Sequence, residues 1–511
     1  MFIEPNTNIK ILKDVPLDNT YEHTLFFSNE NTQLNYFISL KKHELTNYTY
    51  QRVKRGYMRV GIKAENLYDC NYLMFQNTSF GAKWFYAFIK SVEYVNNECS
   101  EIEFEIDVIQ TWFFEYELES SFVDREHSVT DGIGDNLVPE NVNTGELIYN
   151  NYFNHDSMKK MCVIVATLDK EGEIEGKLYD GIYGGCTLTG FKSTSVDKIN
   201  LLLSKYQQKF ENVVSIYMLP EICMPDGWVD GAHLPLNSGA SNFDLFPTNV
   251  SSVMTLDTYK PRNNKLYTYP YNYLVVDNSM GDTLPLRYEF FSGDPHLRVY
   301  SMVTNPVTLS LRPVGYKIPD TLNPNNTEQL TMTNFPICSW GVDSYQAYIA
   351  QQSVRNINTG VNGVANTITG LATGNIVGGI RAGAQAIGDI LSSNTLLSMQ
   401  SDISRGGVGT NNVCVANGIN TFNYGRVSLN RTQAKIIDDY FTRFGYATRE
   451  LKKPNIKSRP HFNYVKTIQC CIKGSIPSDD MRRICNIYDT GITFWKHGDE
   501  VGNYTLDNSP M

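Results

Sequence analysis

Strict alternation of apolar and polar residues predicts a β-strand with one buried face near the end of the first quarter of the chain. In residues 101–108, apolar side chains occupy every second position and acidic side chains occupy the positions between them. Successive side chains of a strand point to opposite faces, so the pattern predicts one buried face and one acidic, solvent-facing row. The apolar positions are Ile102, Phe104, Ile106 and Val108, and the acidic positions are Glu101, Glu103, Glu105 and Asp107.

Shorter runs of aromatic and β-branched residues, bounded by turn-forming or charged residues, predict further strands along the chain. Meanders of this kind are typical of antiparallel sheets, so we predict a mainly β (α+β) fold with a few helices. The predicted strands are residues 34–40, 57–62, 83–89, 161–167, 213–219, 265–277, 286–291, 297–303, 307–311 and 463–473.

Helices are predicted at three places by the spacing of apolar residues or by start signals. Two of them are residues 196–210 and 432–444. The third begins after Pro477, with Ser478 as the N-cap and two acidic residues in the first turn. Residues 125–148 are rich in Asp, Gly and Asn, and we predict that they form a linker.

Residues 356–401 have a pattern found nowhere else in the chain. A run of 25 residues, from Asn356 to Ile380, contains no charged side chain, and glycines recur within it in a tandem GxxxG pattern. This spacing allows helices to approach closely in an apolar setting. The glycines are Gly370, Gly374 and Gly378, and the apolar residues around them are Val361, Val364, Ile368, Leu371, Ile376, Val377 and Ile380.

Two interpretations of this segment remain open from the residues alone. It forms a flexible, glycine-rich surface loop, or it forms an apolar element that is held inside an assembly and released onto a membrane. No stretch of the chain has eighteen consecutive apolar residues, so an ordinary transmembrane helix is not expected.

The composition indicates a folded, acidic protein made in a reducing compartment. The chain has 511 residues, of which 41% are hydrophobic and 12% aromatic, and its formal net charge is −10. A negative chain does not attract phosphate, which argues against sequence-scanning DNA binding but suits a surface past which DNA slides. Ten cysteines are scattered without a CxxC motif, and the chain has no signal peptide at its start, so we expect reduced thiols and folding in a cytosol.

Candidate chemistry is scarce. The chain contains no P-loop, no GxSxG, no HExxH and no EF-hand motif, and its eight histidines are isolated. We therefore expect no enzyme activity, no cofactor and no metal site. The carboxylates of residues 101–107 could serve acid–base chemistry, but a solvated strand face is the simpler interpretation, and a row lining an acidic channel is a further one.

A basic cluster near the end of the chain has aromatic and proline residues interleaved with it. In an acidic chain this composition favours packing or contacts between subunits over nucleic-acid binding. The cluster consists of Arg443, Arg449, Lys452, Lys453, Lys457, Arg459 and Lys466.

Several long stretches resemble the tail knob, or distal tail tube, proteins of small podoviruses that infect Gram-positive bacteria, the picovirus group. These stretches occur in the same order as in that family and cover nearly the whole chain, but they mark no active site. They are residues 50–55, 70–75, 83–89, 103–113, 121–127, 265–274, 454–467 and 491–495.

The resemblance implies a homohexameric tube below the phage collar, through which double-stranded DNA passes without specific binding. It also implies that a hydrophobic loop plugs the tube and enters the host membrane during DNA ejection, and by position that loop is residues 356–401. The expected partners are therefore copies of the chain itself, other tail and collar proteins, the DNA and the host cell membrane. The expected location is the virion tail, after synthesis in the host cytoplasm. The four acidic residues of 101–107 are candidates for the lumen.

Two alternatives to this function remain open: a tube subunit whose loop only stops the lumen, and a receptor-binding or cell-wall-degrading tail module.

The same resemblance suggests a division of the chain into five parts. The parts are a β tube domain at 1–125, an inserted mixed α/β domain at 126–262, a second set of tube strands at 263–340, the loop and plug segment at 341–430, and the end of the tube domain at 431–511.

Overall fold

The computed structural model divides the chain into two compact units, which we describe separately. Unit 1 combines residues 1–145, 258–266 and 431–511, and unit 2 combines residues 146–257 and 267–430. The five-part division remains a prediction. The structure describes residues 6–48, 56–78, 81–154, 161–168, 178–179, 182–183, 186–192, 194–205, 212–221, 224–234, 241–244, 254–277, 283–301, 303, 307–316, 337–340 and 423–510.

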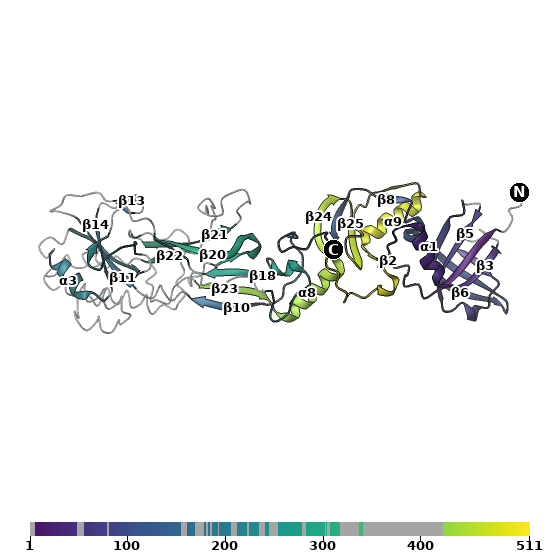
Figure 1. The fold of residues 1–511 in the computed structure, drawn as a ribbon, viewed down its shortest axis with the longest axis horizontal. Helices are drawn as coiled ribbons and strands as arrows, with labels where there is room; N and C mark the ends of the chain where they lie inside the picture. The colour runs from purple at the N-terminus through teal and green to yellow at the C-terminus, as the bar shows by residue number, and fades with distance from the viewer. Residues whose placement is uncertain are drawn as a thin grey trace, which may run out of the picture. The chain divides into compact units, whose positions relative to one another are not determined.

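The predicted mainly β fold with antiparallel sheets and a few helices is confirmed (Figure 1). Among the described residues, every strand pair is antiparallel except one, the parallel pair of β2 (His23–Leu25) with β27 (Ile492–Trp495). Sequential strands of unit 1 lie side by side, as in a meander, from residue 70 to residue 106.

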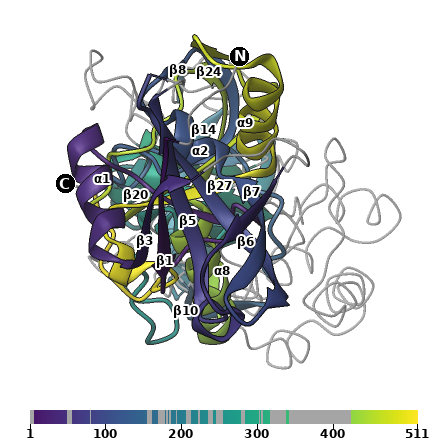
Figure 2. The ribbon, with the colours of Figure 1, turned by 90° about the vertical axis from the view of Figure 1, so that its right-hand side faces the viewer.

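A six-stranded sheet forms the first part of unit 1 and has the order β3-β1-β5-β6-β7-β4. Figure 2 shows β3, β1, β5 and β6 side by side. Its central strand β5 is buried on both faces, which explains the continuous apolar run Tyr72–Phe75. The strands are β1 (Thr7–Lys13), β3 (Lys41–Tyr48), β4 (Tyr57–Val60), β5 (Cys70–Asn77), β6 (Trp84–Asn96) and β7 (Cys99–Ile106).

The predicted strand at 34–40 is wrong, because these residues belong to the helix α1 (Glu30–Ser39). Asn29 caps the helix: its side chain accepts from the backbone N–H of Thr32, and the Thr32 hydroxyl pairs back with the cap. Gln33 and Phe37, four residues apart, both point into the core. The Phe37 ring stacks on Tyr72 of the sheet with centroids 5.3 Å apart. The capping residues therefore decide that this segment is a helix, although its run of aromatic residues is typical of a strand.

A five-stranded sheet of order β2-β27-β25-β9-β24 forms the second part of unit 1. The predicted strand 463–473 divides in two because Gln469 adopts a left-handed conformation with φ of 59°. The elements are β9 (Ser121–Glu126), β24 (Tyr446–Lys452), β25 (Phe462–Ile468), the small pair β8 (Tyr116–Leu118) and β26 (Ile472–Gly474), and the helices α2 (Val108–Trp112), α8 (Arg431–Phe444) and α9 (Ser478–Thr490).

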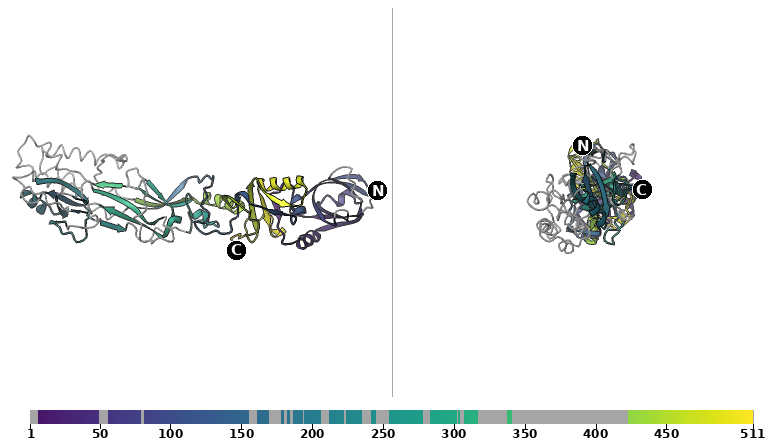
Figure 3. Two further views of the ribbon diagram at one scale, coloured as in Figure 1. Left: turned by 90° about the horizontal axis from the view of Figure 1, so that it is seen from above. Right: turned by 90° about the vertical axis from the view of Figure 1, so that its left-hand side faces the viewer.

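Helix α9 lies along this sheet, as Figure 3 shows from above, and Thr467 of β25 donates to Asp489 of the helix at 2.7 Å. The acidic first turn predicted for α9 is confirmed. The predicted N-cap is wrong: Pro477 occupies that position without a side-chain cap, and Ser478 is already helical. Proline at this position fits because a helix start lacks a partner for its backbone N–H groups.

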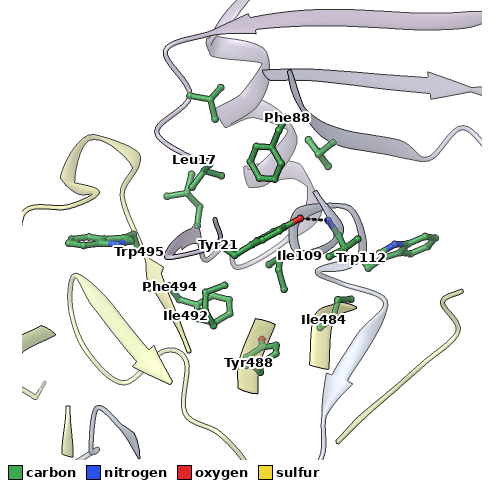
Figure 4. Packing of buried hydrophobic residues seen from close by; sticks show 14 of the residues in the cluster. Leu17, Tyr21, Phe88, Ile109, Trp112, Ile484, Tyr488, Ile492, Phe494 and Trp495 are labelled. Atoms are coloured by element: carbon green, nitrogen blue, oxygen red, sulfur yellow. Dashed lines mark hydrogen bonds between the residues drawn. The ribbon is translucent and has the colours of Figure 1, made fainter. Parts of the chain in front are cut away.

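The core of unit 1 joins the beginning of the chain to its end (Figure 4). Tyr21 lies at its centre and accepts a hydrogen bond from the backbone N–H of Val108 at 3.2 Å. Tyr116 and Tyr488, more than 370 positions apart, pair through their hydroxyls at 3.1 Å. The buried members from the end of the chain are Phe462, Val465, Ile472, Ile484, Tyr488, Ile492, Phe494 and Trp495.

The described residues of unit 2 form three four-stranded sheets, of orders β10-β23-β18-β19, β15-β11-β14-β16 and β17-β20-β21-β22, and the pair β12-β13. Most predicted strands here are confirmed, but the start of 265–277 and the end of 286–291 form 3-10 turns at Asn264–Tyr267 and Tyr288–Phe290. The predicted helix at 196–210 is α3 (Val196–Ser204). The strands are β10 (Leu147–Asn154), β11 (Met161–Thr167), β12 (Leu178–Tyr179), β13 (Ile182–Tyr183), β14 (Thr187–Lys192), β15 (Val213–Pro220), β16 (Ala232–His233), β17 (Ser241–Asp244), β18 (Asn272–Asp277), β19 (Thr283–Leu286), β20 (Phe291–Ser301), β21 (Val307–Tyr316), β22 (Ile337–Trp340) and β23 (Asn423–Leu429).

The Asn29 cap gives a direct test of the α1 assignment. We expect Asn29→Ala to lower the free energy of unfolding of unit 1 by about 1 kcal/mol, because a backbone N–H of the first turn loses its acceptor. Asn31→Ala, a change at an exposed position in the same turn, is the control and should leave stability unchanged or slightly raised. Urea unfolding followed by circular dichroism measures both. Equal stability of the two variants would contradict the capping role.

Candidate functional site: the charged clusters of unit 1

The acidic row of β7 is only partly solvent-facing and is paired with cations. Glu101 accepts from Arg59 at 2.7 Å, and Glu105 pairs with Lys90 at 2.7 Å and with Arg483 at 2.6 Å. Glu103 accepts a hydrogen bond from Ser91 at 3.2 Å. The alternation did not reveal these partners, because they lie on β4, β6 and α9. The row is therefore nearly balanced in charge.

Asp107 does not belong to the solvent-facing row, so that part of the prediction is wrong. The strand ends at Ile106, and Asp107 instead caps α2 by accepting from the backbone N–H of Gln110 at 3.1 Å. Its carboxylate also accepts from the Tyr72 hydroxyl at 2.9 Å and is 1% exposed. Burial raises the pKa of Asp107 to about 6. A carboxylate inside its own unit cannot line a lumen.

The basic cluster divides into buried and exposed members. Arg459 is buried, and its guanidinium donates to the backbone carbonyls of Ser128 and Asn508 at 2.9 and 3.0 Å. Lys452 pairs with Glu126 at 2.7 Å. Both residues therefore make their contacts within unit 1. The exposed members are Arg443, Arg449, Lys453 and Lys457.

A buried carboxylate that the sequence analysis missed fastens the segment 258–266 to unit 1. Asp438 of α8 is fully buried and accepts from the Tyr259 hydroxyl at 2.7 Å. It also accepts from the backbone N–H groups of Arg262 and Asn263 at 2.9 and 3.0 Å. A charged acceptor with several donors is a strong anchor in a dry interior. Its position inside an amphipathic helix gave no signal of this role.

Two further acidic residues fasten the predicted linker at two points. Asp131 accepts from the Tyr446 hydroxyl at 2.6 Å, and burial raises the pKa of both groups. Glu140 is buried between Lys265, at 2.7 Å, and Arg125, and it also accepts from the backbone N–H of Ala447 at 2.8 Å. The linker predicted at 125–148 is confirmed only for residues 127–146, all of them described, which contain no strand or helix. Its first two residues belong to β9 and its last two to β10, and the segment is firmly held.

The loop residues proposed for the plug, from Val361 to Ile380, lie outside the described residues. Within the part of the chain that the structure describes, no helix is long and apolar enough to cross a membrane. The same part contains no group of three or more His, Cys, Asp or Glu side chains arranged to hold a metal ion.

Comparison with known protein families assigns the chain to one of them. A model of the C-terminal domain of the tail knob protein gp9 of Bacillus phage phi29 matches residues 237–509, which is more than half of the chain. The chain belongs to this tail knob family. A model of the N-terminus of the caudoviral major tail protein matches residues 5–117, the region of the six-stranded sheet and α1.

Relatives and a solved structure extend the likeness over the full length. The tail knob proteins gp9 of Bacillus phages PZA and phi29 are each 27% identical, and 98% of both chains is covered. The tail knob protein gp12 of bacteriophage C1 has a similar structure, with a TM-score of 0.57 and 14% identity over 98% of this chain and 99% of that one. This tail knob protein is a structural component of a phage tail and is located in the virion.

Asp107 makes the stability of unit 1 depend on pH. Its folded pKa of about 6 lies above the usual 3.8, so the folded chain holds the proton more tightly and loses stability as the pH rises from about 4 to 6. Asp107→Asn keeps a capping oxygen but cannot ionise. We expect the variant to gain roughly 2–3 kcal/mol relative to the wild type between pH 4 and pH 7.

Urea unfolding of unit 1 at a series of pH values measures this difference, and Glu117→Gln, at an exposed position of β8, is the matched control. Parallel pH profiles for the wild type and Asp107→Asn would contradict a buried, proton-holding Asp107.

Proposed function

We propose that six copies of the chain form a ring or short tube at the distal end of the tail, through which the genome passes. The main support is the full-length likeness to tail knob proteins, combined with the match of residues 5–117 to the N-terminus of a major tail protein. The sheet edges also support it: in the two larger described sheets of unit 1, the edge strands are β3, β4, β2 and β24, and edge strands are places where a neighbouring copy can pair.

The lumen surface of this assembly includes Glu101, Glu103 and Glu105 in our proposal. Their pairing with Arg59, Lys90 and Arg483 gives a face without a strong charge of either sign. Such a face holds phosphate only weakly, and it suits DNA that has to move through without stopping. Added cations at this face should instead retain the DNA.

The lumen assignment predicts the effect of reversing these charges. Phage carrying Glu101→Lys and Glu103→Lys should assemble normal tails but eject DNA more slowly, because lysines in the lumen bind the passing phosphates. Glu117→Lys and Glu119→Lys, at exposed positions in β8 and directly after it, are the matched control. Ejection is followed by a DNA-binding dye after receptor addition. Equal rates in both variants would argue that the row faces away from the DNA.

The second part of the proposal assigns residues 356–401 to the plug and to the host membrane. Burying each of the larger apolar residues in this segment gains roughly 1.5–3 kcal/mol, while each glycine weakens a water-exposed helix by about 1 kcal/mol. The segment is therefore stable only among apolar neighbours, which six copies in a tube mouth supply. After release, the same residues find those neighbours at a lipid interface.

A liposome experiment separates a membrane-active plug from a simple stopper. We expect the intact protein to release a trapped dye, and a variant lacking residues 359–399 to release no more than protein-free liposomes do. Electron micrographs of both proteins are the control that checks whether rings still form. Equal dye release by both proteins would favour the stopper.

A further inference from the structure

We infer that each copy docks a loop of unit 1, residues 132–139, onto an apolar stripe on unit 1 of the neighbouring copy. The stripe consists of Phe122, Leu451 and Ile468, and residues 132–139 are called the anchored loop. The inference rests on the proposed ring, because it names the surfaces that hold adjacent copies together.

The stripe runs straight across three strands. Phe122 of β9 lies directly opposite Leu451 of β24 and directly opposite Ile468 of β25. Directly paired residues of antiparallel strands share a face of the sheet and touch one another, so the three side chains form one continuous surface. Their exposed fractions are 38%, 74% and 50%, whereas the next residue of β9, Val123, is fully buried on the other face.

Helix α8 covers the same face of the sheet but stops short of the stripe. Tyr464, two positions before Lys466 and four before Ile468 on β25, packs against Phe444 of α8 with centroids 5.1 Å apart. Arg125, directly opposite Lys466, lies over the Tyr440 ring of the helix at 4.7 Å. The apolar side chains at the end of the face near the edge strand β24 therefore stay exposed.

The border of the stripe along β24 is mainly positive. Arg449 and Lys453, on either side of Leu451 along the chain, are both exposed, and Glu450 is the only acidic residue between them. An apolar surface with a cationic border selects a partner that is apolar and acidic. It also repels a second copy of itself, which disfavours a contact between two identical stripes.

The anchored loop has the complementary properties. Its apolar residues Ile133 and Leu137 are 47% and 37% exposed, and Asp135 between them is exposed as well. Within residues 132–139, Asp135 is the one acidic residue, and there is no lysine or arginine. A long strand-free loop with exposed apolar residues is typical of a binding loop.

Buried polar contacts hold both ends of this loop in place. Asp131, directly before it, bonds to Tyr446, and Glu140, directly after it, is enclosed by Lys265 and Arg125. The loop is therefore prepared for binding, and docking costs little ordering entropy.

The two surfaces differ, so the contact between them is heterologous and relates copies head to tail. A contact of this kind closes into a ring when its rotation closes, which fits the proposed tube. The stripe and the loop are smaller than the area of about 800 Å² per partner that a stable interface needs. They form the centre of a wider contact, in which the sheet edge at β24 also takes part.

A set of single-residue variants tests the contact. Leu451→Asp places a negative charge in the stripe opposite the acidic loop, and Ile436→Asp, at a comparably exposed position on α8, is the matched control. Both changes are at the surface and should leave the fold intact, as checked by circular dichroism. We expect Leu451→Asp to raise the concentration needed for ring formation by about tenfold or more, and Ile436→Asp to leave it unchanged.

A photo-crosslinking amino acid at position 451 provides the second readout. We expect it to join to residues 132–139 of another copy, as mapped by mass spectrometry of the cross-linked peptides. The charge reversal Lys453→Glu should weaken assembly, and Asp135→Lys in the same chain should restore part of it.

The outcomes separate this inference from the proposed tube. Rings that form equally well in the wild type and in Leu451→Asp, without the cross-link, would overturn the docking and leave the tube standing. The cross-link without rings in the wild type would support the docking and overturn the tube. A cross-link from position 451 to a different tail protein would overturn the docking as well.

Discussion

The apolar core of unit 1, which the two ends of the chain build together, is the constraint on which the rest of the structure depends. Tyr72 and Phe88 from the first sheet lie in the same cluster as Ile484 of α9 and Trp495 of β27. The first sheet also has a second cluster of its own, which includes Ile11, Leu73 and Ile102, but the cluster shared by both ends joins it to the end of the chain. Unit 2 is therefore inserted into the sequence of unit 1 as two segments, residues 146–257 and 267–430.

Buried carboxylates fix the path of the backbone around this core. Asp438 holds the segment 258–266, through which the chain revisits unit 1 between the two segments of unit 2. Asp131 and Glu140 hold the ends of the anchored loop. A buried carboxylate without its donors is costly, so each of these contacts fixes a single path of the backbone. The same contacts position the surfaces that we assign to assembly.

The sequence predicted the elements whose signal is local and missed the contacts that join distant segments. The alternation around Glu103 identified β7, and the start signals after Pro477 identified α9. Aromatic residues at 34–40 suggested a strand because the capping of α1 by Asn29 was weighed too little. The partners of Glu105 and Asp438 come from other elements, and no spacing along one segment reveals them.

The most direct test of this account is native-state hydrogen exchange of the full chain with a change at its far end. Phe494→Leu removes part of the shared core and lies on β27. The account predicts that amides of β5, more than 400 residues earlier, lose protection by the same factor as amides of β25. Unchanged protection of β5, with loss confined to β25 and β27, would contradict a single core built from both ends of the chain.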